Sequence, residues 1–446
     1  MIGEKTLKKT DILYLIIIML SIAVFANSLL KPEPVVLPEM TPGGDLSSSI
    51  NPSNDKADDG YDVNMPIDDS VIIEDSGNDS ADDGVGALDG STIQASTEPT
   101  INARSAIVMD FDTGTILYEK NAYRKRPMAS TTKIMTGIVA IENCSLDEDV
   151  TISEKAGHMG GSVMGIKTGT TIKMRDLLYG MLICSGNDAA VAIAEHVGGS
   201  IEGFSELMNK KALELGAFST SFSNPHGLDA ENHYTTAYDL AKITRYALKM
   251  DIFNDIVKTS EFTYNGRTFR NTNEMLLGYE GADGVKTGYT GRAGRCLVTS
   301  VTKNNMRIIS VVLFCDTKNL RTSSSRRILD YGFEEYGPVT LLEHGNVMGM
   351  VKVDRSRTSQ EIHVAVSEEL KTILRHGQKD MLYTRVSLPE AVTAPVKRGT
   401  IMGTVSIFQG EKIIAETSLI ALDSAEKMKL SNYLSNVVNQ WIKLIH

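Results

Sequence analysis

Ser130 and Lys133 are the residues whose types and spacing most clearly suggest chemistry. Pro127 before them suits the first position of a helix, because its missing N–H would be unpaired there in any case. Residues three apart lie on one face of a helix, so the Ser130 hydroxyl and the Lys133 amine can meet. A serine becomes a good nucleophile when a base takes its proton, and a buried lysine can be that base. The pattern predicts a nucleophile and its base, although so short a pattern also occurs by chance.

Two later stretches contain further reactive residues at motif spacing. The first is Cys184-Ser185-Gly186-Asn187-Asp188, and the second is Asp283-Gly284-Val285-Lys286-Thr287-Gly288-Tyr289-Thr290. The ordered set S-x-x-K, S-x-N and K-T-G resembles the signature of serine β-lactamases and penicillin-binding proteins. Because three short patterns in one fixed order are far more specific than any one of them, a chance origin is disfavoured.

The elements that would position these motifs form an α+β domain over residues 103–335. Two apolar runs flank a short Asp/Gly turn and predict a hairpin, and two more strands follow the K-T-G run, with helices between. The economical fold is one antiparallel sheet built from both ends of the domain, flanked by helices and with a helical block beside it. The predicted strands are 106–109, 116–118, 295–301 and 306–314, and the predicted helices are 174–183, 189–197, 204–215 and 236–248.

The two ends of the chain have different compositions from this domain. Residues 1–30 combine lysines with the apolar run Ile12–Ala26, which predicts either a cleaved export signal or a short membrane anchor. Residues 31–102 are rich in Asp, Ser and Gly without apolar periodicity, which predicts a disordered acidic linker. The chain is therefore expected to be exported, extracytoplasmic and associated with the cell membrane. The net charge of −11 argues against nucleic acid as a partner, because phosphate binding needs clustered Lys and Arg.

Residues 336–423 contain short strand-like runs separated by Gly and Pro, which predicts a small all-β domain. Residues 424–446 follow with apolar residues at helical spacing, among them the chain's one tryptophan, Trp441. This pattern suits an amphipathic helix in a membrane interface, and the alternative is a helix packed on the β domain.

From about residue 103 to residue 332 the chain resembles a serine-type D-alanyl-D-alanine carboxypeptidase, a low-molecular-mass penicillin-binding protein of peptidase family S11. Besides the three motifs, Met109-Asp110 through Thr113-Gly114 and Asn224-Pro225-His226-Gly227-Leu228 carry the resemblance. The second motif reads Ser-Gly-Asn, not the Ser-Asp-Asn of class A β-lactamases. The resemblance implies removal of the terminal D-alanine from peptidoglycan stem pentapeptides through an acyl-enzyme, with β-lactams as inhibitors and no cofactor or metal.

The resemblance also implies a role for each catalytic residue. Lys133 would take the proton of Ser130, which attacks the D-Ala–D-Ala carbonyl. Ser185 and Lys286 would help to pass a proton to the leaving amine. Asn187 would hold Lys133 and the substrate amide.

Further positions would bind the substrate. The oxyanion needs two N–H donors, which by resemblance come from the nucleophile and from Tyr289. The substrate would lie along the edge strand that contains Gly288, and Thr287 would bind its terminal carboxylate. Arg321 has the family's spacing to Tyr331-Gly332 and would bind the same carboxylate, its alternative being a solvated loop charge.

Other candidate groups have structural interpretations. His226 with Asp229 or Asp239 could form a His-Asp pair, but it lies in a Pro-Gly loop. Glu206 with Asn209 resembles a deacylating pair but falls in an amphipathic run. No cluster of His, Cys and acidic residues has the sequence spacing of a zinc site. The four cysteines could form disulfides or stay free; they are Cys144, Cys184, Cys296 and Cys315.

Three classes of function follow from these patterns. The first is the carboxypeptidase. The second is a β-lactamase or a penicillin sensor on the same fold. The third is a non-catalytic cell-wall-binding protein, which is disfavoured because every motif residue is present. Turnover of a D-Ala–D-Ala peptide would distinguish them.

Overall fold

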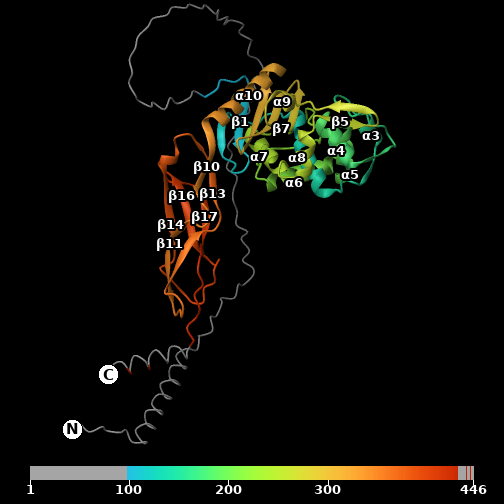
Figure 1. Ribbon diagram of the computed structural model, residues 1–446. Coiled ribbons are helices and arrows are strands. Elements are labelled where there is room, and N and C mark those ends of the chain that lie inside the picture. The colour runs from blue at the N-terminus through green and yellow to red at the C-terminus, as the bar shows by residue number, and fades with distance from the viewer. Residues whose placement is uncertain (1–97, 430–437, 439–441, 443–446) are drawn as a thin grey trace, which may run out of the picture. The chain divides into compact units, whose positions relative to one another are not determined.

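The computed structural model describes residues 98–429 together with Val438 and Ile442 (Figure 1). The predicted export segment and nearly all of the predicted linker lie outside the described residues. Residues 98–102 belong to the folded domain and not to that linker, because Ile101 is buried and its carbonyl accepts a hydrogen bond from Lys120 Nζ at 2.8 Å.

A five-stranded antiparallel sheet organises the catalytic domain, in the order β2-β1-β9-β8-β7. Its strands come from both ends of the domain, as predicted. The first two form the hairpin, and the last three follow the helical region. β7 carries the K-T-G motif on an edge of the sheet. The bounds are β1 Ser105–Asp110, β2 Ile116–Lys120, β7 Ala282–Thr290, β8 Gly294–Lys303 and β9 Met306–Cys315.

Side chains of the sheet alternate between two cores, as the period of two in a strand requires. Ile107 and Val298 pack into the core shared with the helical block. Their neighbours Val108 and Leu297 pack on the other face, against helix α10 (Lys318–Glu335). Both faces of the sheet are covered, which explains why its strands are apolar on both sides. The packed sheet holds its edge strand β7 in place.

The helical block contains the predicted helices at nearly the predicted bounds. They are α4 Met174–Ile183, α5 Asn187–Gly198, α6 Ile201–Glu214 and α7 Ala237–Ala247. The nucleophile-bearing helix was predicted to start at Pro127, but its α-helical part, α2, spans Lys133–Asn143, and α8 Asp251–Lys258 follows α7. Short elements that the sequence did not predict lie between and after these helices. They are α3 Glu154–Gly157, α9 Met275–Gly278, β3 Asp149–Thr151, β4 Thr171–Lys173, β5 Glu261–Tyr264 and β6 Arg267–Arg270.

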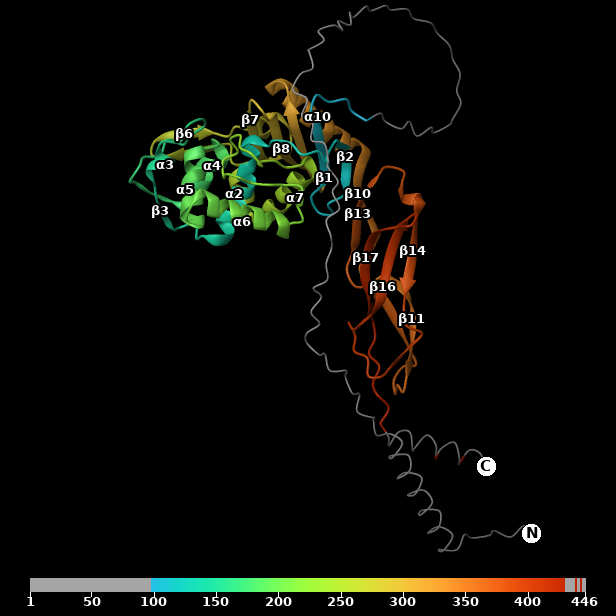
Figure 2. The same cartoon turned by 180° about the vertical axis from the view of Figure 1, so that it is seen from behind.

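The C-terminal domain is all-β in the described residues, as predicted (Figure 2). β10 pairs with β13, and six strands form a sheet in the order β14-β16-β17-β12-β11-β15. The strand-like runs predicted in this domain correspond to β10, β11, β12, β14 and β16, whereas β13, β15 and β17 were not predicted. The bounds are β10 Tyr336–Leu342, β11 Val347–Asp354, β12 Glu361–Val366, β13 Leu370–Arg375, β14 Leu382–Ser387, β15 Ala391–Thr393, β16 Ile401–Gln409 and β17 Lys412–Ala421, with a 3-10 turn η2 at Lys379–Met381.

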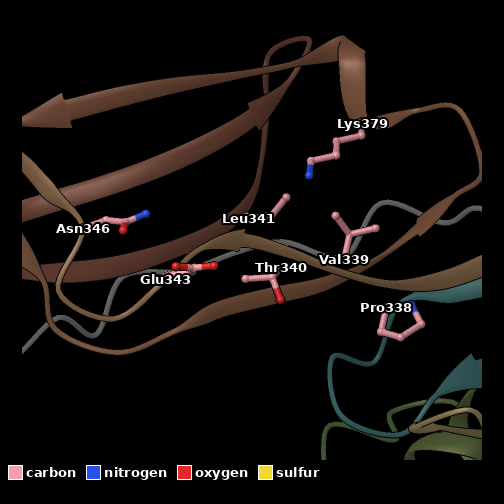
Figure 3. A pocket seen from close by; sticks show the side chains of 7 residues that line it. All are labelled: Pro338, Val339, Thr340, Leu341, Glu343, Asn346 and Lys379. Carbon is pink, nitrogen blue, oxygen red and sulfur yellow. The ribbon is translucent and has the colours of Figure 1, made fainter.

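A hollow of about 700 Å³ opens beside β10 in this domain (Figure 3). Val339 and Leu341 of the strand line it, and Lys379 of η2 lies across from them. None of its lining residues belongs to a catalytic motif, so this hollow is separate from the predicted chemistry.

The predicted C-terminal helix does not begin at residue 424. Ala425 forms an isolated β-bridge with Val396, and Lys427 forms one with Ser356. These backbone pairs hold residues 424–429 against the β domain in extended conformation. Most of the predicted helix beyond Lys429 lies outside the described residues. Within the described part of the chain, the helices are too short or too polar to cross a membrane.

Candidate active site

Ser130 lies in a 3-10 turn, η1 (Ala129–Thr132), and not in the α-helix that the sequence predicted. The α-helix α2 begins at Lys133. The turn is held by the Thr131 hydroxyl, which donates to the carbonyl of Met128 at 2.6 Å, and Ala129 has a positive φ of 48°. Side chains three apart also lie close in a 3-10 helix, so the serine and the lysine still meet.

Lys133 is fully buried and contacts three oxygen atoms. Its Nζ lies 3.0 Å from Ser130 Oγ, 2.8 Å from Asn187 Oδ1 and 2.7 Å from the carbonyl oxygen of His226. The amide and carbonyl oxygens can only accept, so they use two N–H groups of the amine. Ser130 Oγ can also donate, so a neutral amine can offer it the remaining lone pair.

The electrostatic environment of Lys133 favours that neutral form. Burial, and after it the charge of Lys286, hold the pKa of Lys133 well below its usual range. Desolvation disfavours an ammonium ion and a second nearby cation adds to the effect. The lowered pKa therefore favours a neutral lysine that is hydrogen-bonded to a serine hydroxyl and can act as its base.

The second motif forms the turn between α4 and α5. Ser185 has a positive φ of 65° and is nearly buried. Asn187 is the first residue of α5, and its Nδ2 donates to the carbonyl of Gly160 at 2.8 Å. Because that bond fixes the nitrogen, the amide oxygen is the atom that faces Lys133.

Asp188 is a residue of the site region that the sequence reasoning missed. Its buried carboxylate accepts hydrogen bonds from the backbone N–H groups of Met164, Gly165 and Ile166 at 2.8, 2.6 and 3.2 Å. It thereby anchors the loop that also presents the Gly160 carbonyl to Asn187. The one hint in the sequence that Asp188 belongs to the site region was its position next to Asn187 in the second motif.

The third motif lies on β7, which packs against η1, the 3-10 turn that contains Ser130. A Cβ atom at Gly288 would lie 2.9 Å from the backbone nitrogen of Ser130, so only glycine allows this approach. Lys286 is buried, and burial lowers its pKa to about 7. Tyr289 is 54% exposed, with the Arg295 guanidinium 3.6 Å from its ring centroid.

Arg321 is a buried helical residue and not a solvated loop charge. Its Nη2 donates to Glu274 Oε1 at 2.5 Å, while Arg321 Nε and Glu274 Oε2 are buried without a hydrogen-bond partner in the structure. Its partner Glu274 immediately precedes helix α9, which packs against β7, and the Arg321 charge contributes to the lowered pKa of Lys286. Thr287 Oγ1 donates to Thr272 Oγ1 at 2.8 Å. No local pattern in the sequence marks Glu274 as a partner of Arg321.

The His-Asp pair considered for His226 does not form. His226 Nδ1 accepts from the N–H of Leu228 at 3.2 Å, and burial lowers the pKa of the imidazole to about 3. The Asp229 carboxylate instead accepts from Thr290, and that of Asp239 accepts from the N–H of Ser219. The structural interpretation of the ring is confirmed, and the residue's contribution to the site is its backbone carbonyl.

The remaining side candidates are also structural. Asn209 exchanges two hydrogen bonds of 2.8 Å with the backbone of Phe222, which places it in a loop anchor. All four cysteines are free thiols, which resolves the question that their even number had left open.

The fold and the three motif-bearing elements define a penicillin-binding type of serine enzyme, and comparisons identify the family. Residues 92–317 match the family model described as D-alanyl-D-alanine carboxypeptidase, and residues 336–427 match the one described as penicillin-binding protein 5, C-terminal domain. The chain therefore belongs to the D-alanyl-D-alanine carboxypeptidase family, as its motifs indicated. The predicted α+β catalytic domain, the all-β C-terminal domain and the hydrolase class are confirmed.

Individual relatives are similar to this chain over most of its length. It is 35% identical over 353 residues to D-alanyl-D-alanine carboxypeptidase DacF of Bacillus subtilis, covering 76% of this chain and 90% of the relative. It is 36% identical to DacC of Escherichia coli, covering 74% and 86%. The crystal structure of penicillin binding protein 5 from Haemophilus influenzae matches with a TM-score of 0.65 and 31% identity, over 75% of this chain and 100% of that one.

Proposed function

We propose that this chain removes the terminal D-alanine from peptidoglycan stem pentapeptides through an acyl-enzyme on Ser130. The observation that carries the proposal is the buried amine of Lys133, 3.0 Å from Ser130 Oγ and hydrogen-bonded to two acceptors that leave its lone pair for the hydroxyl. A base already in contact with its nucleophile is what acyl transfer by a serine requires.

In the acylation step Ser130 attacks the D-Ala–D-Ala carbonyl while Lys133 takes its proton. The oxyanion is stabilised by the backbone N–H groups of Ser130 and Tyr289. The close packing of Gly288 on the nucleophile turn supports this pairing, because it holds β7 beside the Ser130 nitrogen. Asn187 keeps the lysine in place and also binds the substrate amide.

The leaving D-alanine amine needs a proton as the C–N bond breaks. Ser185 and Lys286 pass that proton on. The pKa of about 7 for Lys286 suits this role, because a group with a pKa near the working pH can both give and regain a proton. The Ser185 hydroxyl, nearly buried in its strained turn, relays it.

The free carboxylate of the substrate distinguishes a carboxypeptidase substrate from an internal peptide bond. Thr287 and Arg321 bind it. The buried Arg321 guanidinium has one nitrogen without a partner, which supports this assignment. Water then hydrolyses the acyl-enzyme, and β-lactams, which imitate D-Ala–D-Ala, acylate the same serine.

The site of action is the outer face of the cell membrane. The Lys-rich start of the chain and its apolar run support export, and the amphipathic pattern after residue 429 supports contact with the membrane surface.

The test is turnover of a D-Ala–D-Ala pentapeptide, with D-alanine release and covalent labelling by a fluorescent penicillin measured side by side. The carboxypeptidase releases D-alanine repeatedly and is labelled. Labelling without turnover would indicate a penicillin sensor, hydrolysis of the penicillin in preference to the peptide would indicate a β-lactamase, and neither reaction would indicate a wall-binding protein.

A further inference from the structure

Three potential metal ligands of different chemistry meet at one end of the helical block. They are Cys144, Glu148 and His196, and their ligand atoms all lie within 4.8 Å of one another. Cys144 follows the last residue of α2, Glu148 precedes β3, and His196 lies near the end of α5. The sequence predicted no metal site, because no cluster of His, Cys and acidic residues has zinc spacing; His196 is 48 positions from Glu148.

The Glu148 carboxylate is already held in a position from which it could bind a metal ion. Its Oε1 accepts from the N–H of Ser145 at 2.7 Å, and its Oε2 lies 3.2 Å from His196 Nε2. The loop between Cys144 and Glu148 is fixed in turn, because the N–H of Met174 donates to the Glu148 carbonyl at 2.9 Å and that of Arg175 to the Leu146 carbonyl at 3.0 Å.

These distances are close to those of a tetrahedral zinc site. Zn–S bonds of about 2.3 Å and Zn–N or Zn–O bonds of about 2.0–2.1 Å place neighbouring ligand atoms about 3.3–3.6 Å apart. The His196–Glu148 distance of 3.2 Å is just below that range, and Cys144 Sγ lies within 4.8 Å of both ligand atoms. The Cys144 side chain is only partly buried, so it has room to adjust. Thiolate, imidazole and carboxylate together select Zn²⁺ over Mg²⁺ or Ca²⁺, which prefer oxygen ligands alone.

We propose that Cys144, Glu148 and His196 bind Zn²⁺, with water in the fourth position. On binding, the Cys144 thiol loses its proton to solvent, and the His196 ring carries its remaining proton on Nδ1 so that Nε2 is free to bind the metal. No electrons are transferred, because Zn²⁺ has no redox chemistry in proteins.

The location of the cluster gives the ion a structural role. α2 and α5 pack against each other, and the catalytic residues Lys133 and Asn187 are their first residues. The cluster connects the opposite ends of the same two helices. At about 1.5 Å per residue, the 11 residues of α2 separate it from Lys133 by roughly 16 Å. The zinc ion therefore ties α2 to α5 without contact with the reacting groups.

The proposal is tested by titrating the full-length chain, purified in detergent under reducing conditions, with Co²⁺ as a spectroscopic substitute for Zn²⁺. A thiolate-to-cobalt charge-transfer band should appear at one equivalent. It should be absent in Cys144→Ser, although that variant keeps the other three cysteines. In His196→Gln the affinity should fall by more than about 100-fold, because even the loss of an outer partner of a ligand costs about 10–100-fold.

His344→Gln, an exposed histidine in the C-terminal domain, is the matched control and should bind as the unchanged chain does. No charge-transfer band in the unchanged chain, or a band that survives in Cys144→Ser, would overturn the site. Zn²⁺ should also raise the thermal unfolding midpoint of the unchanged chain and of His344→Gln, but not of Cys144→Ser. An unmoved midpoint in the unchanged chain would overturn the structural role. D-alanine release without metal should be the same in Cys144→Ser as in the unchanged chain, so this test is independent of the proposed reaction.

Discussion

Replacing Asn187 by aspartate should place a negative charge beside the proposed base with almost no change of shape. The Asn187 amide oxygen lies 2.8 Å from Lys133 Nζ. An aspartate oxygen at that position would favour the ammonium form of the lysine, and an ammonium ion cannot accept the Ser130 proton. The variant should therefore fold and yet acylate slowly at neutral pH.

The size of the effect can be worked from that distance. Two unit charges 2.8 Å apart at an effective dielectric constant of about 20 attract by roughly 6 kcal/mol, which corresponds to about 4 pKa units. This is an upper bound, because the aspartate itself loses hydration and faces the Gly160 carbonyl that Asn187 Nδ2 contacts. Half of that shift would still lower the rate of acylation about 100-fold at any pH below the pKa of Lys133 in both the unchanged chain and the variant.

The assay is the rate of labelling by a fluorescent penicillin as a function of pH. In the unchanged chain acylation should fall as the pH drops through the lowered pKa of Lys133, because only the neutral amine is a base. In Asn187→Asp this acid limb should move to higher pH, and raising the pH should restore much of the rate. Asn187→Ala is the control: it loses the contact but adds no charge, so its acid limb should not move upward. An acid limb at the same pH in Asn187→Asp and in the unchanged chain would refute Lys133 as the base.

Three further predictions follow from the site and the ends of the chain. Ser130→Ala should abolish both D-alanine release and penicillin labelling at an unchanged unfolding midpoint, and surviving labelling would remove Ser130 from the mechanism. Glu274→Gln should lower the KM for a D-Ala–D-Ala peptide about 5–10-fold, because exchanging the charged partner of Arg321 for a neutral one weakens their hydrogen bond by about 1–1.5 kcal/mol; a KM that rises would contradict carboxylate binding by Arg321. A chain of residues 98–429 should release D-alanine but not bind anionic vesicles, whereas one of residues 98–446 should bind them, less tightly at high salt; equal flotation of the two would place membrane contact elsewhere.

The spacing of Ser130 and Lys133 was enough to predict that these two side chains meet. Ser130 and Lys133 are neighbours in a 3-10 turn as well as in an α-helix, so the error about the type of helix did not affect the prediction. The sheet was predictable for a similar reason, because apolar runs with turn residues between them specify strands wherever they lie in the chain. The short strands β3 to β6 were missed, since three or four residues are too few to show a period.

The contacts that were missed all depend on tertiary structure. Glu274 lies 47 positions from Arg321, and no local pattern marks it as the partner. The third oxygen at Lys133 is the backbone carbonyl of His226, 93 positions away, and a carbonyl has no side-chain signature. The cluster of Cys144, Glu148 and His196 likewise forms only when α2 and α5 pack together. Sequence motifs report side chains close along the chain, while these partners are fixed by packing.

The two buried lysines explain why this site can contain both a base and an acid. Lys133 and Lys286 are both buried, and the charge of the second disfavours the charge of the first. Their environments differ: the pKa of Lys133 is held well below its usual range, while that of Lys286 is lowered only to about 7. When the environments of two titratable groups move their pKa values apart, the two groups are candidates for the acid and the base of the reaction. The site therefore holds one lysine beside Ser130 whose neutral form is favoured, so that it can accept a proton, and another with a pKa of about 7, which can give one near neutral pH.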